Sequence, residues 1–263
     1  MPASALMNVM TKAARKAGRA LARDFGEVEH LQVATKGPAD FVSRADHRAE
    51  KIIYEELAHA RPNYCFLMEE QGVVEGADKT HRWIVDPLDG TTNFLHGIPQ
   101  FAISIALERD GKLVAGLIFN PVMDELYTAE KGSGAFLNDR RIRVAGRSSL
   151  EDAVVVTGVP HRGKSGKEVF IHECRQVMQT AVGIRRTGSA AIDLAWLAAG
   201  RFDGYWERGI QAWDMAAGIV LVREAGGMVS DAEGGHDMLT SGSIVAGNAP
   251  IQQELQKTIQ TGS

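Results

Sequence analysis

Five short apolar segments in the middle of the chain, separated by tight-turn signals, constrain its fold most. Asp110-Gly111 and Asn138-Asp139 are turns of the kind that close hairpins, and Asn120-Pro121 marks a further turn. Strands joined by such short turns pair antiparallel, because a parallel pair needs a long crossover connection. This meander predicts an α+β protein rather than a regular βαβ repeat. The expected strands are residues 101–107, 113–119, 125–129, 134–137 and 141–144.

Helices precede the meander. Apolar residues at helical spacing predict a helix over residues 4–25, and a second helix begins after Ser43 or Asp46 and ends near His59. Residues 26–43 are expected to be irregular, with Lys36-Gly37-Pro38 as a breaker. A short strand over residues 81–86 follows and ends in a turn.

After Leu150 the pattern changes to alternating strands and helices, which is typical of a layered α/β arrangement. We expect a soft boundary near residues 145–150, with an N-terminal α+β half (1–147) and a C-terminal α/β half (148–263). The predicted strands are residues 154–157, 203–207, 228–231 and 244–247, and the predicted helices are residues 169–182, 188–199, 214–225 and 251–259.

Charge and cysteine content exclude several classes of protein. The chain has 263 residues and a formal net charge of −4, so as a whole it is not a basic nucleic-acid-binding protein, although a local patch stays open. Two cysteines, Cys65 and Cys174, indicate reduced thiols and a cytoplasmic protein. No uncharged apolar run approaches the roughly 18 residues of a membrane span. Basic residues also interrupt the N-terminal apolar positions, so no signal peptide is expected.

The strongest chemical signal is the stretch from Trp83 to Phe94. A hydrophobic strand delivers Asp86 to its end, Pro87 fixes the turn, and Asp89 can point its carboxylate back beside that of Asp86. With the carbonyl of Leu88 between them, these oxygens form the ligand set of a hard cation such as Mg²⁺. The alternative is a simple turn at Asp89-Gly90 followed by a helix cap. That alternative explains each residue singly but not the spacing of the two carboxylates.

The residues that follow Asp89 indicate an anion site. Gly90-Thr91-Thr92-Asn93 has the character of a helix start, whose free backbone N–H groups bind anions. Metal ions beside a phosphate cradle are the apparatus for hydrolysing a phosphate ester.

Two further acidic elements join this set. Glu69-Glu70 follows the apolar run from Tyr64 to Met68, and alone it would be a solvated turn. Asp214 precedes a helix and alone would be an N-cap. Arg185-Arg186 could belong to a substrate-binding loop or to a dimer contact. The eight histidines lack the paired spacing of a zinc site.

Together these motifs resemble the inositol monophosphatase family, part of the superfamily of Mg²⁺-dependent, Li⁺-sensitive phosphatases. The stretch from Asp86 to Phe94 resembles the family's first signature, and Trp213 to Gly218 its second. The order of elements fits from about residue 5 to residue 255. The resemblance implies a layered α-β-α-β-α sandwich of the inositol monophosphatase and fructose-1,6-bisphosphatase type. It also implies a homodimer.

The resemblance further implies roles for individual residues. Glu69, Asp86 and the Leu88 carbonyl would hold a first Mg²⁺. Asp86, Asp89 and Asp214 would hold a second, and a third, weaker ion would use Glu69. Most metal ligands thus lie in the N-terminal half, and Asp214 lies in the C-terminal half. Thr91 would hold the nucleophilic water, and Asp46 would accept its proton. The N–H groups of Gly90 and Thr91 would bind the phosphate. Arg185, Ala190 and Glu207 would face the alcohol part of the substrate.

The favoured function is hydrolysis of inositol 1-phosphate by metal-activated water. The same chemistry on histidinol phosphate, a sugar bisphosphate or adenosine 3′,5′-bisphosphate is an open alternative. The other open alternative is a binding or regulatory protein that keeps this fold and acts on a protein or RNA partner. A complete acidic set argues against loss of catalysis but not against a second role.

Overall fold

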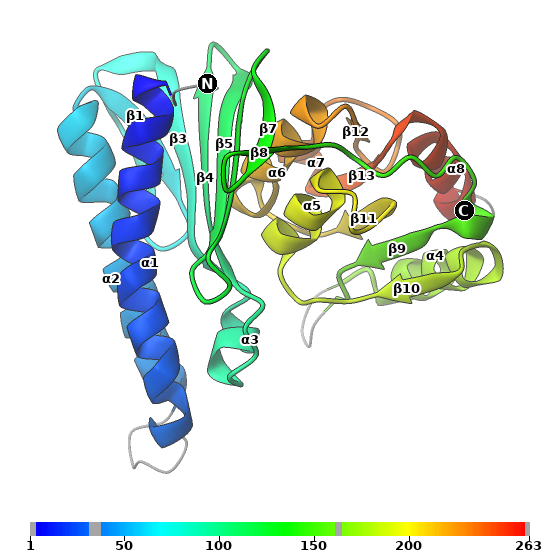
Figure 1. The fold of residues 1–263 in the computed structure, drawn as a ribbon, viewed down its shortest axis with the longest axis horizontal. Helices are drawn as coiled ribbons and strands as arrows, with labels where there is room; N and C mark the ends of the chain where they lie inside the picture. Colours follow the sequence, from blue (N-terminus) through cyan, green and yellow to red (C-terminus); the bar gives the residue numbers. More distant parts are fainter. Residues whose placement is uncertain (1–3, 32–37, 161–164, 261–263) are drawn as a thin grey trace.

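Two mixed sheets, separated by a helical layer and covered by helices on both outer sides, form the structure (Figure 1). The computed structural model describes residues 4–31, 38–160 and 165–260. The helices are α1 (Ala5–Leu31), α2 (Pro38–Ala60), α3 (Thr91–Leu95), α4 (Lys167–Thr180), α5 (Ala190–Ala198), α6 (Ala212–Glu224), α7 (Met238–Ser241) and α8 (Ala249–Gln260), with a 3₁₀ turn over Leu150–Asp152.

The first sheet has the strand order β2-β1-β3-β4-β5-β6-β7-β8 and is antiparallel except for the parallel pair β1 and β3. The second sheet has the order β10-β9-β11-β13-β12. The strands of the first sheet are β1 (Tyr64–Met68), β2 (Gly72–Val74), β3 (Asp78–Asp89), β4 (Ala102–Arg109), β5 (Lys112–Asn120), β6 (Glu125–Glu130), β7 (Gly134–Leu137) and β8 (Arg140–Ile142). Those of the second are β9 (Val154–Thr157), β10 (Gly183–Arg185), β11 (Gly204–Arg208), β12 (Met228–Ser230) and β13 (Ser243–Gly247).

These layers confirm the expected α+β architecture. Helices α1 and α2 cover one face of the first sheet, α5 and α6 fill the space between the sheets, and α4 and α8 cover the far face of the second (Figure 1). All strands of the first sheet precede residue 143 and all strands of the second follow residue 153. The buried cluster between the sheets draws on both, so the two predicted halves share a core.

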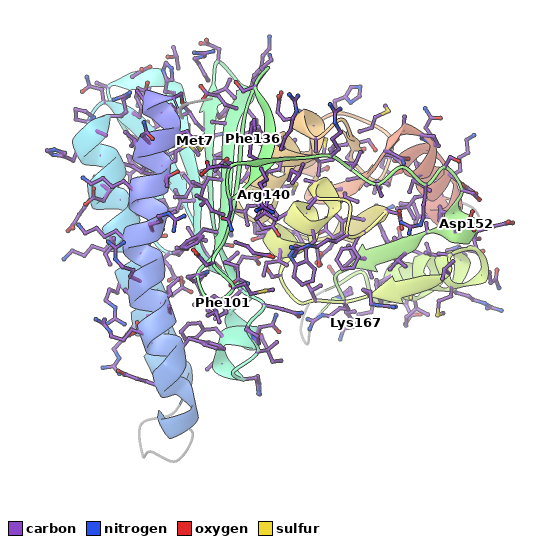
Figure 2. All side chains as sticks on the ribbon, viewed as in Figure 1. Met7, Phe101, Phe136, Arg140, Asp152 and Lys167 are labelled. Atoms are coloured by element: carbon purple, nitrogen blue, oxygen red, sulfur yellow. The ribbon has the colours of Figure 1, made fainter. Side chains whose placement is uncertain are left out.

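Alternation along β3 shows why this strand is buried on both faces. Trp83 and Val85 belong to the core under α1 and α2, whereas Ile84 belongs to the core shared with α5 and α6. Side chains fill the space between the layers (Figure 2). The Phe101 ring, labelled there beside α3, packs edge-on against Phe94 with 5.0 Å between the ring centroids.

Helix α6 lies unusually close to the first sheet. A Cβ at Gly116 of β5 would lie 2.5 Å from the carbonyl oxygen of Ala217, so only glycine allows this approach. The close contact brings the N-terminal end of α6, with Asp214, toward the end of β3.

The predicted meander is confirmed at every strand, but the N-terminal region differs from expectation. Residues 26–31 and 38–43, predicted to be irregular, are helical as parts of α1 and α2. Pro38 opens α2 instead of breaking a helix, because proline is well tolerated at the first helical position. Lys36 and Gly37 lie outside the described residues. Over the described ranges, no helix combines the length and apolar character that crossing a bilayer requires.

Candidate active site

A β-bulge in β3 brings Asp86 and Asp89 to one face of the sheet. Asp86 pairs with Ser104 of β4 and Asp89 with Ala102, so three steps on β3 oppose two on β4. Residues three apart on a regular strand point to opposite faces, and one extra residue restores the same face. Pro87 within the bulge has no N–H to donate to the ladder. The sequence predicted that the strand ends in a turn at Asp86. In the structure the strand continues to Asp89.

Asp86 and Asp89 are held by different partners. Asp86 is buried, and its Oδ1 accepts the Leu88 N–H at 2.9 Å. The Oδ2 of Asp89 accepts the Ser189 hydroxyl at 2.5 Å and the Ala191 N–H at 2.7 Å. Ser189 is the N-cap of α5, so Asp89 is fixed by the first turn of that helix.

Asp214 completes a group of three carboxylates. An oxygen atom from each of Asp86, Asp89 and Asp214 lies within 4.8 Å of the others. Asp214 also acts as a cap, because its Oδ2 accepts the Gln211 N–H at 2.7 Å in the first turn of α6. The cap is thus at position N3 of a helix that begins at Ala212, rather than at the N-cap residue considered from the sequence.

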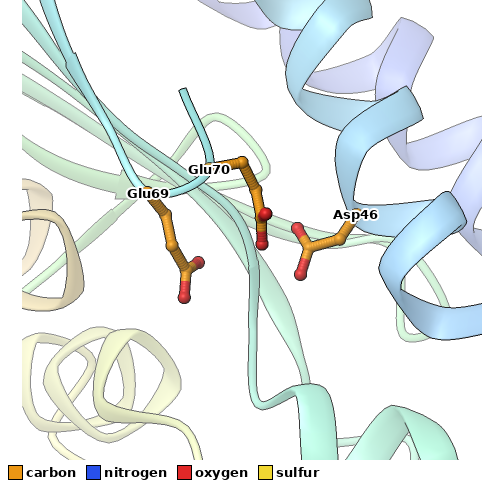
Figure 3. A group of neighbouring side chains, drawn as sticks. All are labelled: Asp46, Glu69 and Glu70. Atoms are coloured by element: carbon orange, nitrogen blue, oxygen red, sulfur yellow. The ribbon is translucent and has the colours of Figure 1, made fainter. Parts of the chain in front are cut away.

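Asp46, Glu69 and Glu70 form a second acidic group next to the first. Figure 3 shows Asp46 reaching from α2 toward the two glutamates in the turn after β1. Parallel pairing of β1 and β3 sets Met68 opposite Val85, and the Glu69 N–H donates to the Val85 carbonyl at 3.3 Å. This pairing places Glu69 beside Asp86.

Burial and the charges of neighbouring carboxylates raise the pKa values of four of these groups, Asp46, Glu69, Asp86 and Asp89. Burial, followed by the charges of Glu69 and Glu70, raises the pKa of Asp46 to about 8. Burial raises the pKa of Glu69 to about 7 and that of Asp89 to about 8, and in both the charge of Asp214 adds to the effect. The pKa of Asp86 is also well above its usual range, mainly through burial and then through the charge of Glu69.

The acidic groups fit a hard cation. Among the described residues, the buried atoms Oδ1 of Asp46 and Oε2 of Glu69 have no hydrogen-bond partner. Buried anions are stable only when paired, hydrogen-bonded or bound to a metal ion. Oxygen donors without thiol or imidazole among them suit Mg²⁺, Ca²⁺ or Mn²⁺.

The start of α3 lies directly after the bulge. Gly90 has a φ of 92°, and a Cβ there would lie 2.8 Å from the Gln100 carbonyl oxygen, so the position requires glycine. The first N–H groups of a helix lack intrahelical acceptors and attract anions. The Thr91 hydroxyl donates to the Leu88 carbonyl at 3.1 Å. The first turn of α3 and the Leu88 carbonyl thus adjoin the carboxylates.

Three residues expected to face the substrate lie at different places. Ala190 is buried in the first turn of α5, beside the Ser189 and Ala191 groups that hold Asp89. Glu207 on β11 accepts the Tyr205 hydroxyl at 2.7 Å, and its charge contributes to the raised pKa of Asp89. Arg185 ends the edge strand β10, and its exposed side chain donates to the Ile184 carbonyl. Within the described part of the chain, Arg185 has no ion pair with the acidic groups.

Sequence reasoning missed Ser189 and Asn93. The Asn93 side chain donates to the carbonyls of Gln100 at 2.6 Å and Thr187 at 2.9 Å, which ties α3 to the segment before α5. The sequence signal for Ser189 was its position as a capping residue before an apolar helix. Asn93 gave no signal of its own, because its partners are distant in sequence.

The five-layer fold gathers carboxylates beside a helix start, and this arrangement suits the metal-assisted hydrolysis of a phosphate monoester. Comparison with known proteins agrees. Residues 3–262 match the inositol monophosphatase family. The inositol-1-monophosphatase of Mesorhizobium japonicum is 64% identical over 260 residues, covering 99% of this chain and 98% of the relative. The Nus factor SuhB of Pseudomonas aeruginosa is 44% identical, covering 97% of this chain and 96% of the relative.

The fold comparison gives the same result. A crystal structure of the extragenic suppressor protein SuhB of Bartonella henselae superposes with a TM-score of 0.92 at 60% identity, covering 99% of this chain and all of that one. The chain belongs to the inositol monophosphatase family. It is a phosphoric monoester hydrolase.

Proposed function

We propose that the chain hydrolyses myo-inositol 1-phosphate to myo-inositol and phosphate. The observation that carries the proposal is the set of carboxylates, with Asp46 and Asp86 buried among them, that converge beside the first turn of α3. The name of the Mesorhizobium japonicum relative supports the choice of substrate. Inhibition by Li⁺ is expected from family resemblance.

The proposed cofactor is Mg²⁺, with two ions and a third, weaker one. Glu69, Asp86 and the Leu88 carbonyl would hold the first ion, and a third would use Glu69. The grouping of Asp86 with Asp89 and Asp214 supports their role as ligands of the second. Mg²⁺ at the first position would lower the pKa of a water molecule, and both ions would screen the phosphate charge.

The chain's own residues would orient the reactants. Thr91 would hold the attacking water, and Asp46 would accept its proton through the Thr91 hydroxyl. This relay requires the hydroxyl to turn its hydrogen from the Leu88 carbonyl, where it now points, toward Asp46. The N–H groups of Gly90 and Thr91 would bind the phosphate oxygens as fixed dipoles. The alcohol would face Glu207, Ala190 and Arg185, and the reaction would proceed by direct in-line attack of water.

A panel of phosphate esters tests the substrate. We expect the highest kcat/KM with myo-inositol 1-phosphate, above histidinol phosphate, fructose 1,6-bisphosphate and adenosine 3′,5′-bisphosphate. Asp86→Asn serves as the inactive control. A clear preference for another ester would keep the chemistry and replace the substrate.

The SuhB names of two relatives support a second candidate role, on a protein or nucleic-acid partner. Phosphate release from none of the panel would favour this role over catalysis. The proposed assembly is a homodimer. The proposed location is the cytoplasm, which the free thiols of Cys65 and Cys174 support.

A further inference from the structure

Glu50 is a fully buried carboxylate, 0% exposed, that lies one helical turn after Asp46 on α2. Its Oε2 accepts the Glu70 N–H at 2.9 Å and its Oε1 accepts the Gln71 N–H at 3.0 Å. Both donors belong to the turn between β1 and β2 that carries Glu69. Within the described ranges, Glu50 has no ion pair with a basic residue.

This arrangement joins α2 to the turn by two charge-assisted hydrogen bonds, which are stronger than neutral ones. Residues four apart on a helix lie on the same face, so α2 presents Asp46 and Glu50 to the turn together. Helix α2 therefore contributes Asp46 to the acidic group (Figure 3) and, through Glu50, fixes the backbone that carries the other two members.

We propose that Glu50 is a positioning residue that sets the location of Glu69 relative to Asp46 and Asp86 for cation binding. The inference rests on the proposed metal centre. Glu50 is not among the carboxylates grouped as possible ligands, and each of its oxygens accepts a backbone N–H. Loss of such an outer partner typically weakens metal affinity about 10–100-fold.

The test measures Mn²⁺ binding to the full-length, metal-free protein. Electron paramagnetic resonance monitors the concentration of free Mn²⁺ during the titration. Glu50→Asp keeps the charge and withdraws the acceptors by one methylene, whereas Glu50→Gln keeps the length and removes the charge. Both should bind Mn²⁺ about 10–100-fold more weakly than the wild type. In turnover assays both should need more Mg²⁺, while KM for the phosphate ester stays nearly constant.

Asp203→Asn is the matched control. Asp203 is also a buried carboxylate that accepts a backbone N–H, that of Val154 at 2.8 Å, and it lies in the second sheet's half. The control should lose thermal stability without losing Mn²⁺ affinity. Wild-type affinity in Glu50→Asp would overturn the inference, as would equal weakening in Asp203→Asn. If the wild-type protein bound no Mn²⁺, the proposed metal centre itself would be wrong. This outcome differs from failure of the Glu50 inference alone, in which the wild type binds Mn²⁺ and Glu50→Asp binds it equally well.

Discussion

Substituting Asp214 separates its two possible contributions, as a helix cap and as a cation ligand. Asp214→Asn keeps an oxygen that can accept the Gln211 N–H but removes the charge, whereas Asp214→Ala removes both. The two variants lose the same charge and differ only in the cap. Their comparison therefore isolates each contribution.

The expected magnitudes follow from the geometry. Two unit charges 4.8 Å apart, the limit within this group, repel by about 3 kcal/mol at an effective dielectric constant of about 20. Partial protonation lowers the repulsion actually felt, so the metal-free Asn variant should be at least as stable as the wild type. Loss of the cap costs about 1 kcal/mol. That corresponds to a Tm about 2–4 °C lower for the Ala variant than for the Asn variant.

Thermal denaturation in EDTA measures the cap, and Mg²⁺ titration of phosphate release measures the ligand. Both variants should need much more Mg²⁺ for half-maximal activity and turn over more slowly. If Asp214→Asn kept the wild-type Mg²⁺ requirement, Asp214 would be only a cap, and its assignment to the metal centre would be wrong.

Three other predictions concern the relay, pH and assembly. Thr91→Ala and Asp46→Asn should each lower kcat by about 10²–10⁴, and the double variant should be little worse, because the pair acts as one unit; losses that multiply would refute the relay. Because the folded pKa values of Asp46, Glu69 and Asp89 are raised to about 7–8, the metal-free protein should lose stability as pH rises from about 4 through 8. The gain in Tm on adding Mg²⁺ should then be larger at pH 8.5 than at pH 6, and equal gains would contradict this. Light scattering at micromolar concentration should report a dimer, and a monomer would contradict the proposed assembly.

The sequence predicted the fold where the determining contacts are local. Three hairpins of the meander are marked by their own turn residues, such as Asp110-Gly111, and were found as expected. The parallel pairing of β1 with β3 depends on contacts between strands that no turn signal reports, and the sequence did not predict it. The short strand β2 and the short helix α7 were also missed, because segments of three or four residues show no periodicity.

The sequence predicted which acidic residues belong to the site, but not the backbone features that bring them together. The acidic side chains were recognised from their spacing and from family resemblance, and the structure groups them. The bulge that turns Asp86 and Asp89 to one face could not be read from the sequence, because it is defined by the register against β4. The supporting residues Ser189 and Glu50 act through partners about 100 and 20 residues away, so no local pattern marks them.

In the proposed mechanism, the grouped carboxylates hold the cations needed to hydrolyse a phosphate monoester. The most direct measurement is phosphate release from myo-inositol 1-phosphate by protein treated with EDTA and then supplied with increasing Mg²⁺. We expect phosphate release to stop in EDTA and to return with Mg²⁺. Full activity in metal-free buffer would contradict it.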